Sequence, residues 1–150
     1  MSTVSAFRLR DRYFIHPNKR TTTGLHVAQP DFTCLPLNAT VEAIGRAILA
    51  ALAQSQGVVP HPTDWTALSK PRLAAAGVRS ERAFMAGTKL VEVERGENYR
   101  LEPTRNGGSS GDARGFARLQ DGQVSLSLHS SPQTVGEAFL KLLEECAVET

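Results

Sequence analysis

The sequence lacks a long apolar run, a strong net charge and a cysteine framework, and each absence narrows the class of protein. The longest mainly apolar run, Ala43 to Ala53, is far shorter than the ~20 residues that cross a bilayer, and it contains Arg46. The formal net charge of +2 at pH 7 is too small to recruit nucleic acid or an anionic membrane by itself. We therefore expect no membrane partner, and overall charge does not favour nucleic acid as a partner.

The chain has only two cysteines, Cys34 and Cys146, and neither belongs to a CxxC motif or to a Cys/His cluster with metal-ligand spacing. We expect both to be buried or partly buried thiols, and we expect no metal and no cofactor. The N-terminus has no apolar signal-peptide core, because Arg8, Arg10 and Asp11 come too early. These features predict a cytoplasmic protein.

Length and composition predict one folded domain. The chain has 150 residues, of which 41% are hydrophobic and 21% are charged. This size and balance are typical of a single domain with its own core. We therefore expect residues 1–150 to form one domain.

The N-terminal segment predicts a β-hairpin. Residues Ala6–Arg10 alternate between apolar and polar side chains, and Tyr13–Ile15 is β-prone after a charged turn. We expect His16-Pro17-Asn18 to end the second strand, since proline has no N–H to donate. The polar residues from Lys19 to Gly24 then predict an exposed loop.

Helical spacing of apolar residues and capping residues predict four helices. The first covers Val41–Leu52, with Asn38 or Thr40 as its cap and Gly57 at its close. A short second helix runs through Trp65 and Leu68 with Thr63 or Asp64 as its cap, and a third covers Arg72–Ala76, with Pro71 in its first turn and Gly77 at its end. The last begins after Ser130 or Ser131 and carries on one face Val135, Phe139, Leu142 and Leu143.

Two further hairpins are predicted between these helices. In the first, Lys89–Glu94 and Tyr99–Pro103 alternate on either side of a turn. In the second, Phe116–Leu119 and Val124–Leu128 flank the turn Gln120-Asp121-Gly122, after a flexible Gly-rich loop. Strands without strict β-α alternation favour an α+β fold, in which helices pack on an antiparallel β-sheet meander.

Familiar catalytic motifs are missing from the sequence. It contains no GxSxG, GxxxxGK[ST], GxGxxG or HExxH pattern. None of the four histidines, His16, His26, His61 and His129, has a sequence context that supports catalysis. We therefore predict that the protein is not an enzyme. The alternative is an enzyme in which the fold brings His16 or His26 to a carboxylate.

Basic residues cluster near the N-terminus, with aromatic Tyr13 and Phe14 between them. The cluster consists of Arg8, Arg10, Arg12, Lys19 and Arg20. Positive charge interleaved with aromatic rings is typical of single-stranded nucleic-acid binding, so an RNA-binding or single-strand-binding module is one hypothesis. Arg8 and Arg10 also fit an ordinary solvated strand face, opposite Phe7 and Leu9.

Acidic residues occupy the first central hairpin. Glu92 and Glu94 project to one face of their strand and Val91 and Val93 to the other, while Glu97 lies at the turn. Glu102 follows on the second strand. This carboxylate row can meet a basic partner, and it is equally typical of a solvent-exposed face.

Several separated segments together carry a resemblance to a known family. They are Tyr13–Asn18, Arg20–Leu25, Ala76–Ser80 with Phe84, Pro103–Asn106 before the Gly-rich loop, Gly115–Phe116, and Val135–Leu140 in the closing helix. These segments are spread over most of the chain, and they resemble the immunity proteins of bacterial contact-dependent growth inhibition systems, the CdiI proteins.

The resemblance implies a cytoplasmic protein that binds the C-terminal toxin domain delivered by a neighbouring cell and blocks its active site or substrate surface. The toxin in such systems is often a nuclease. Neutralisation of this kind needs no catalytic residues and no cofactor, but it does need a tightly complementary interface. For a basic nuclease the acidic surface must be local, which makes Glu92, Glu94, Glu97 and Glu102 the predicted toxin-binding residues.

Overall fold

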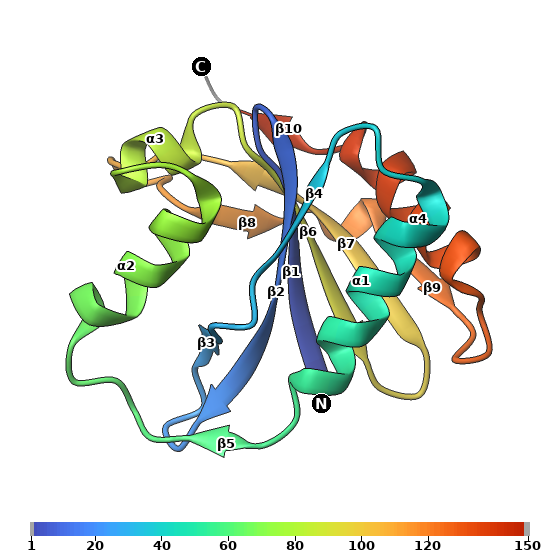
Figure 1. The fold of residues 1–150 in the computed structure, drawn as a ribbon, viewed down its shortest axis with the longest axis horizontal. Helices are drawn as coiled ribbons and strands as arrows, with labels where there is room; N and C mark the ends of the chain where they lie inside the picture. Colours follow the sequence, from blue (N-terminus) through green and yellow to red (C-terminus); the bar gives the residue numbers. More distant parts are fainter. Residues whose placement is uncertain (1, 149–150) are drawn as a thin grey trace.

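The chain folds around a central, mostly antiparallel sheet in the computed structural model, which describes residues 2–148 (Figure 1). Its strands are β1 (Ser2–Arg8), β2 (Arg12–Thr21), β3 (His26–Ala28), β4 (Thr33–Pro36), β5 (Val58–Val59), β6 (Lys89–Arg95), β7 (Tyr99–Asn106), β8 (Phe116–Arg118), β9 (Val124–Leu126) and β10 (Ala147–Val148). Its helices are α1 (Val41–Gln54), α2 (Trp65–Ala76), α3 (Glu81–Met85), α4 (Pro132–Leu143) and the 3-10 turn η1 (Gln120–Gly122). The expected α+β class, with helices packed on an antiparallel sheet, is confirmed.

The sheet is built outward from β1. Strands follow the order β10-β7-β6-β1-β2-β3, β4 and β5 also pair with β2, and β8 and β9 also pair with β7. The predicted hairpins β1–β2 and β6–β7 are both present.

None of the helices within residues 2–148 is long and apolar enough to cross a membrane.

Strand β2 continues through Pro17 to Thr21, so the predictions of a break at 16–18 and of a loop from Lys19 were wrong. The Gln29 N–H donates to the Pro17 carbonyl at 2.9 Å, on the side of the strand away from β1. The N and O atoms of a strand residue point to the same side, so the missing N–H of Pro17 removes no hydrogen bond to β1. Residues 18–20 then pair with β3.

Helices α1 and α4 cover one face of the sheet, and both were predicted. Thr40 caps α1 by accepting a hydrogen bond from the Ala43 N–H, and Ser131 caps α4 in the same way. The two helices approach closely at two glycines. A Cβ atom on Gly45 would lie 1.8 Å from the Pro132 carbonyl oxygen, and one on Gly136 would lie 2.1 Å from the Val41 oxygen. No larger residue fits at either position.

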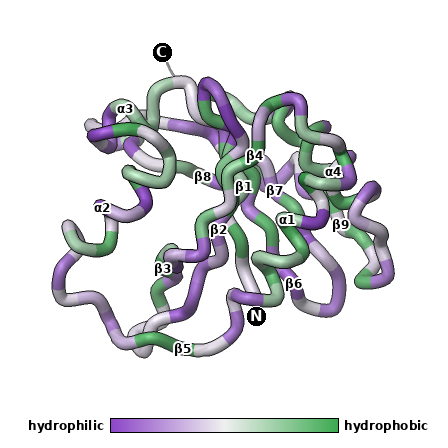
Figure 2. Tube along the Cα trace, viewed as in Figure 1, coloured by the Kyte–Doolittle hydropathy of each residue, from purple (hydrophilic) through white to green (hydrophobic). Residues whose placement is uncertain are grey.

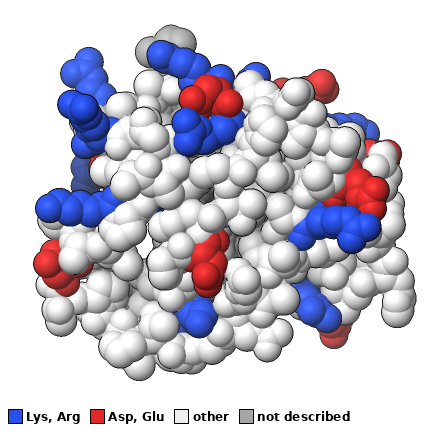
Figure 3. Space-filling model, in the orientation of Figure 1, with Lys and Arg blue, Asp and Glu red and all other residues white. Residues whose placement is uncertain are grey.

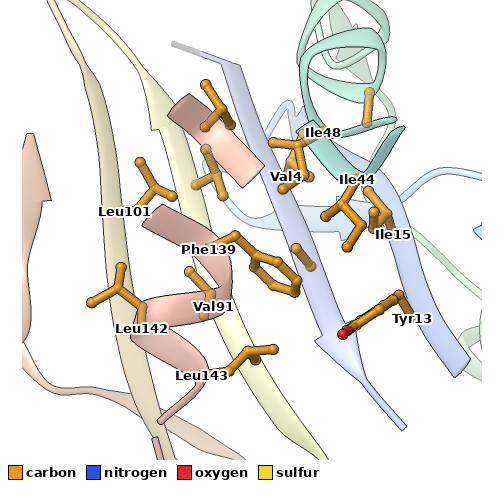
Figure 4. Close-up of a cluster of buried hydrophobic side chains, with 14 of the residues drawn as sticks. Val4, Tyr13, Ile15, Ile44, Ile48, Val91, Leu101, Phe139, Leu142 and Leu143 are labelled. Atoms are coloured by element: carbon orange, nitrogen blue, oxygen red, sulfur yellow. The ribbon is translucent and has the colours of Figure 1, made fainter. Parts of the chain in front are cut away.

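The main apolar core lies beneath these two helices. Figure 4 shows Phe139 of α4 between Tyr13 of β2 and Val91 of β6, and the Tyr13 and Phe139 rings meet edge to face with centroids 5.8 Å apart. Ile44 and Ile48 of α1 complete the cluster, and both are fully buried. The apolar segments gather where α1 and the central strands meet (Figure 2).

Helix α2 is a single helix where two were predicted. Asp64 caps it, Pro71 lies inside it, and Gly77 ends it in the left-handed region at φ 77°. Proline leaves the Ala67 carbonyl without its helix hydrogen bond. Because Ala67 and Pro71 are both exposed, water can satisfy that carbonyl, and the helix continues. The short helix α3 follows, capped by Ser80, and was not predicted.

Strands β8 and β9 do not form the predicted hairpin with each other. Both pair with β7, end to end: β8 with Thr104–Asn106 and β9 with Tyr99–Leu101. The Leu119 N–H donates to the Pro103 carbonyl at 2.8 Å and keeps the chain on β7 up to η1. Strand β7 is eight residues long, so its free edge has room for both short strands, one after the other.

The two thiols differ in exposure. Cys146 is buried, as predicted, and its Sγ lies 3.3 Å from the Leu90 oxygen. Cys34 is exposed, which contradicts the prediction. It pairs with Phe14 across β2 and β4 and therefore projects to the same face as Phe14, where the cover provided by α2 is incomplete.

We predict that Gly136→Ala destabilises the fold, because the added methyl group must displace the α1 backbone. The expected loss is about 1–3 kcal/mol of the free energy of unfolding, even though alanine favours helices. Urea unfolding measures the loss. The matched control is Gly96→Ala, whose Cβ atom would meet no atom within 4 Å. Equal stability of both variants would contradict the close contact between the two helices.

Candidate functional site

The second face of the sheet carries polar side chains where the first face is apolar. Alternation along β1 directs Val4 and Ala6 to the main core, and Thr3 and Ser5 to the opposite face. Ser5 pairs in register with His16 on β2 and with Glu92 on β6. A polar row of serine, histidine and carboxylate thus crosses three neighbouring strands.

Two arginines neutralise two of the predicted acidic residues on this face. Arg100 hydrogen-bonds Glu94, and Arg118 Nη1 lies 2.8 Å from Glu94 Oε1. Glu102 joins them at 3.4 Å from Arg100 Nε and 3.6 Å from Arg118 Nη1. Burial acts to raise the pKa of Glu94, but the hydrogen bonds from Arg118 and Arg100 outweigh it and lower that pKa. Glu94 and Glu102 are therefore buried and paired.

The remaining two acidic residues have different surroundings. Glu97 is exposed at the β6–β7 turn, away from the ion pairs. Glu92 lies on the sheet face, and its only hydrogen-bond partner among residues 2–148 is the Ser5 hydroxyl, 3.4 Å from each carboxylate oxygen. The structure thus brings Glu92, Glu94 and Glu102 together and leaves Glu97 apart. Their role as toxin contacts stays a prediction.

A cavity of about 400 Å³ opens above Glu92, and we call it the Glu92 cavity. Its lining includes Ser5, His16, Asn18 and Glu92 from the sheet, Phe84 and Glu81 from α3, Arg72 from α2 and Phe116 from β8. Asn18 Nδ2 donates to Ser5 Oγ at 2.9 Å, which holds the serine in place. Burial raises the pKa of Glu92 to about 7. This carboxyl group therefore changes charge near neutral pH.

His16 is a buried strand residue, although the sequence placed it in a loop. Burial lowers its pKa to about 4, so it is neutral at physiological pH. Its Nδ1 lies 3.3 Å from the Pro17 oxygen. Ser5 stands between His16 and Glu92, and no hydrogen bond joins Ser5 to His16 among the described residues. His16 is therefore not placed to take the Ser5 proton, and the row does not form the serine–histidine pair of an acyl-transfer site.

The basic N-terminal residues do not form one surface. Arg8, Arg10 and Arg12 lie at the turn between β1 and β2, where Arg12 Nε is 3.0 Å from Asp11. Lys19 and Arg20 lie at the far end of β2, roughly 23 Å away at about 3.3 Å per strand residue. Figure 3 shows Lys and Arg side chains gathered over α3 instead. The nucleic-acid hypothesis therefore has less support than it has in the sequence, and it stays a prediction.

Sequence reasoning missed several residues of this site. Ser5 and Asn18 fell outside the predicted strands, and Arg118 was not connected to the acidic row. Period-two alternation extended back to Thr3 and on through Pro17 would have placed the first two on the same face as Glu92. Arg118 reaches the row only because β8 pairs with β7. Among residues 2–148 no three His, Cys, Asp or Glu side chains are arranged so that they could hold a metal ion.

Comparison with known proteins gives a match by family and by fold. The family model described as CDI immunity protein matches residues 4–146. A search among curated proteins gives no match by sequence.

Two solved structures share the fold at low sequence identity. A protein of unknown function from Neisseria meningitidis superposes with a TM-score of 0.72 at 16% identity, covering 97% of this chain and 94% of the other. A chain of the CdiA-CT/CdiI toxin and immunity complex from Yersinia pseudotuberculosis superposes with a TM-score of 0.74 at 16% identity, covering 97% of each chain. The likeness extends over nearly the whole fold.

We predict that Glu92→Gln stabilises the free protein at alkaline pH. The folded-state pKa of about 7 lies above the ordinary value of 4.5, so the wild type loses stability as pH rises between these values, and glutamine escapes that loss. The expected gain in free energy of unfolding is up to about 3 kcal/mol at pH 8, at about 1.4 kcal/mol per pKa unit, and near zero at pH 4. Urea unfolding at both pH values measures it.

His16 is present in both wild type and Glu92→Gln, so the difference in their free energies of unfolding reports on Glu92. The control is Glu97→Gln, which removes the same charge from an exposed position. A gain in stability that is the same at pH 4 and pH 8 would show that Glu92 is not buried as a free carboxyl group.

Proposed function

Because the chain belongs to the CDI immunity protein family, we propose that it neutralises a toxin by binding. The toxin is the C-terminal domain of a cognate contact-dependent growth inhibition effector. Binding is stoichiometric, and it covers the active site or substrate surface of the toxin. The observation that carries this proposal is the family match over nearly the whole chain, and the shared fold with a chain of a toxin and immunity complex supports it.

The size of the molecule suits this task. A typical specific interface buries about 800 Å² on each partner, which is roughly a tenth of the 8292 Å² that this chain exposes. One side of the protein can therefore cover a toxin active site while the apolar core under α1 and α4 stays undisturbed. Inhibition by occlusion requires only complementary shape and charge.

We propose that the interface includes the polar face of the sheet and the β6–β7 turn, and so contains Glu92, Glu94, Glu97 and Glu102. Glu97 offers an exposed carboxylate directly. Glu94 and Glu102 act differently, because they hold Arg100 and Arg118, whose side chains are 42% and 40% exposed. These two arginines are fixed donors that a partner can reach.

Two finer parts complete the proposal. The protein acts in the cytoplasm, where a delivered toxin reaches its target. The toxin is a nuclease, since toxins of these systems often are. A basic nuclease would meet carboxylates on this chain, and the small net charge of +2 requires that they be local.

Co-expression with the C-terminal toxin domain encoded immediately upstream tests the proposal. We expect a stable one-to-one complex on size-exclusion chromatography and restored growth of cells that express the toxin domain. An immunity protein from an unrelated toxin pair serves as the control and restores nothing. If the toxin domain stops growth and this chain neither binds it nor restores growth, the immunity role is wrong.

A second measurement tests the nuclease part separately. The purified toxin domain is expected to degrade RNA or DNA, and one equivalent of this chain is expected to stop the degradation. A toxin domain that this chain binds and neutralises, but that degrades neither nucleic acid, contradicts the nuclease assignment alone.

A further inference from the structure

The Glu92 cavity and its surroundings hold one carboxylate more than they hold cations. The carboxylates are Glu81, Glu92, Glu94 and Glu102, and the guanidinium groups are Arg72, Arg100 and Arg118. Arg72 pairs with Glu81, and the other two arginines pair with Glu94 and Glu102. Within residues 2–148, Glu92 has no ion-pair partner. It is the uncompensated negative charge of this face.

Glu92 is weakly satisfied within this polar face. Among residues 2–148, Ser5 Oγ is the only hydrogen-bond donor to it, at a long 3.4 Å from each carboxylate oxygen. On the same face Thr3 Oγ1 and Arg100 Nε are buried without a hydrogen-bond partner in those residues, although Arg100 Nε lies 3.4 Å from Glu102. Polar groups away from water are normally hydrogen-bonded, so the Glu92 carboxylate suits a ligand that brings N–H donors.

Aromatic rings form the walls of the cavity. Phe7 meets Phe84 edge to face at 5.1 Å and Phe116 at 5.8 Å. The Arg72 guanidinium lies 4.3 Å above the buried Phe84 ring and so covers it. The half-buried Phe116 ring is the aromatic wall that a ligand can reach. A carboxylate together with an accessible ring suits an arginine side chain, which pairs by charge and packs its planar group on aromatic carbon.

A second cavity of about 390 Å³ lies beside α2 and shares Ala28, Arg72 and Glu81 with the Glu92 cavity. Trp65 lines it and is 52% exposed. An exposed tryptophan next to a charged pocket is typical of the few residues that dominate a protein interface.

We propose that the Glu92 cavity receives one arginine side chain of the toxin domain, which pairs with the Glu92 carboxylate and packs against the Phe116 ring. This inference rests on the proposed function and names the chemistry of its main contact. The toxin segment that carries the arginine lies over the second cavity beside Trp65.

The proposed contact makes binding depend on pH. The groups that face Glu92 are Glu94 on its own strand, Glu102 from β7, Arg118 from β8, His16 from β2, Arg72 from α2 and Glu81 from α3. Burial holds the pKa of His16 at about 4 and raises that of Glu92 to about 7, so Glu92 changes charge near neutral pH while His16 stays neutral. Arginine binds only the ionised form, whose fraction falls about tenfold from pH 8 to pH 6 for a pKa near 7.

Isothermal titration calorimetry with the cognate toxin domain tests the contact. We expect wild type to bind roughly tenfold more weakly at pH 6 than at pH 8. Glu92→Gln is expected to bind roughly 30-fold or more weakly than wild type at pH 8, because the arginine loses its charge partner. The same variant should lose the part of the pH dependence that comes from Glu92. Glu137→Gln, which removes the same charge from an exposed position on α4 outside the proposed interface, is the matched control and should keep both the affinity and that pH dependence.

The outcomes separate this inference from the proposed function. If wild type binds the toxin domain and Glu92→Gln binds equally well with the same pH dependence, the arginine contact is wrong and the immunity role stands. If wild type does not bind the toxin domain at all, both fail.

A small probe tests the cavity without the toxin. Methylguanidinium chloride is expected to shift the carbon-13 signal of the Glu92 carboxyl group saturably at pH 8, relative to sodium chloride at equal ionic strength. A Glu92 signal that responds identically to both salts would overturn the proposed recognition of a guanidinium group.

Discussion

The pairing of β1 on both edges, together with its burial on both faces, is the constraint on which the rest of the structure depends. Ser2 to Phe7 are all buried, between β2 on one side and β6 on the other. A strand in this position can have no side chain in water. Val4 and Ala6 find partners under α1 and α4, whereas Thr3 and Ser5 must be accommodated among polar groups. The polar face of the sheet follows from this alternation.

An unpaired carboxylate on a largely buried face lowers stability, and packing of the core does not require one. A hydrophobic residue at position 92 would remove the uncompensated charge, and an arginine or lysine nearby would pair it. Two carboxylates on the same face are paired in that manner, so the fold has the means to do it. The unpaired state of Glu92 is consistent with a surface that is complete only when a partner is bound.

Much of this architecture could be predicted from local patterns, because short-range physics decides it. The hairpins β1–β2 and β6–β7 follow from period-two alternation, and α1 and α4 follow from apolar spacing and from the capping side chains of Thr40 and Ser131. The errors arose where the surroundings of a residue decide. Pro17 fits inside β2 because its nitrogen faces away from β1. Pro71 fits inside α2 because that part of the helix is exposed and water can hydrate the freed carbonyl.

The acidic residues of the candidate site could be predicted from the sequence, but their burial and their ion pairs could not. Alternation correctly put Glu92 and Glu94 on one face, but an unpaired strand gives no indication of burial or of distant partners. Arg100 could have been found by cross-strand pairing with Glu94. Arg118 could not, since its position depends on β8 lying along β7 after a long loop.

The contact of α4 with the early strands also bears on how the fold is reached. Helix α4 lies at residues 132–143, yet it shares the main core with Val4, Tyr13 and Ile44. The core is therefore closed by segments that are far apart in the sequence. Because the chain loses entropy before such distant contacts form, we expect this fold to form more slowly than a helical bundle of the same size.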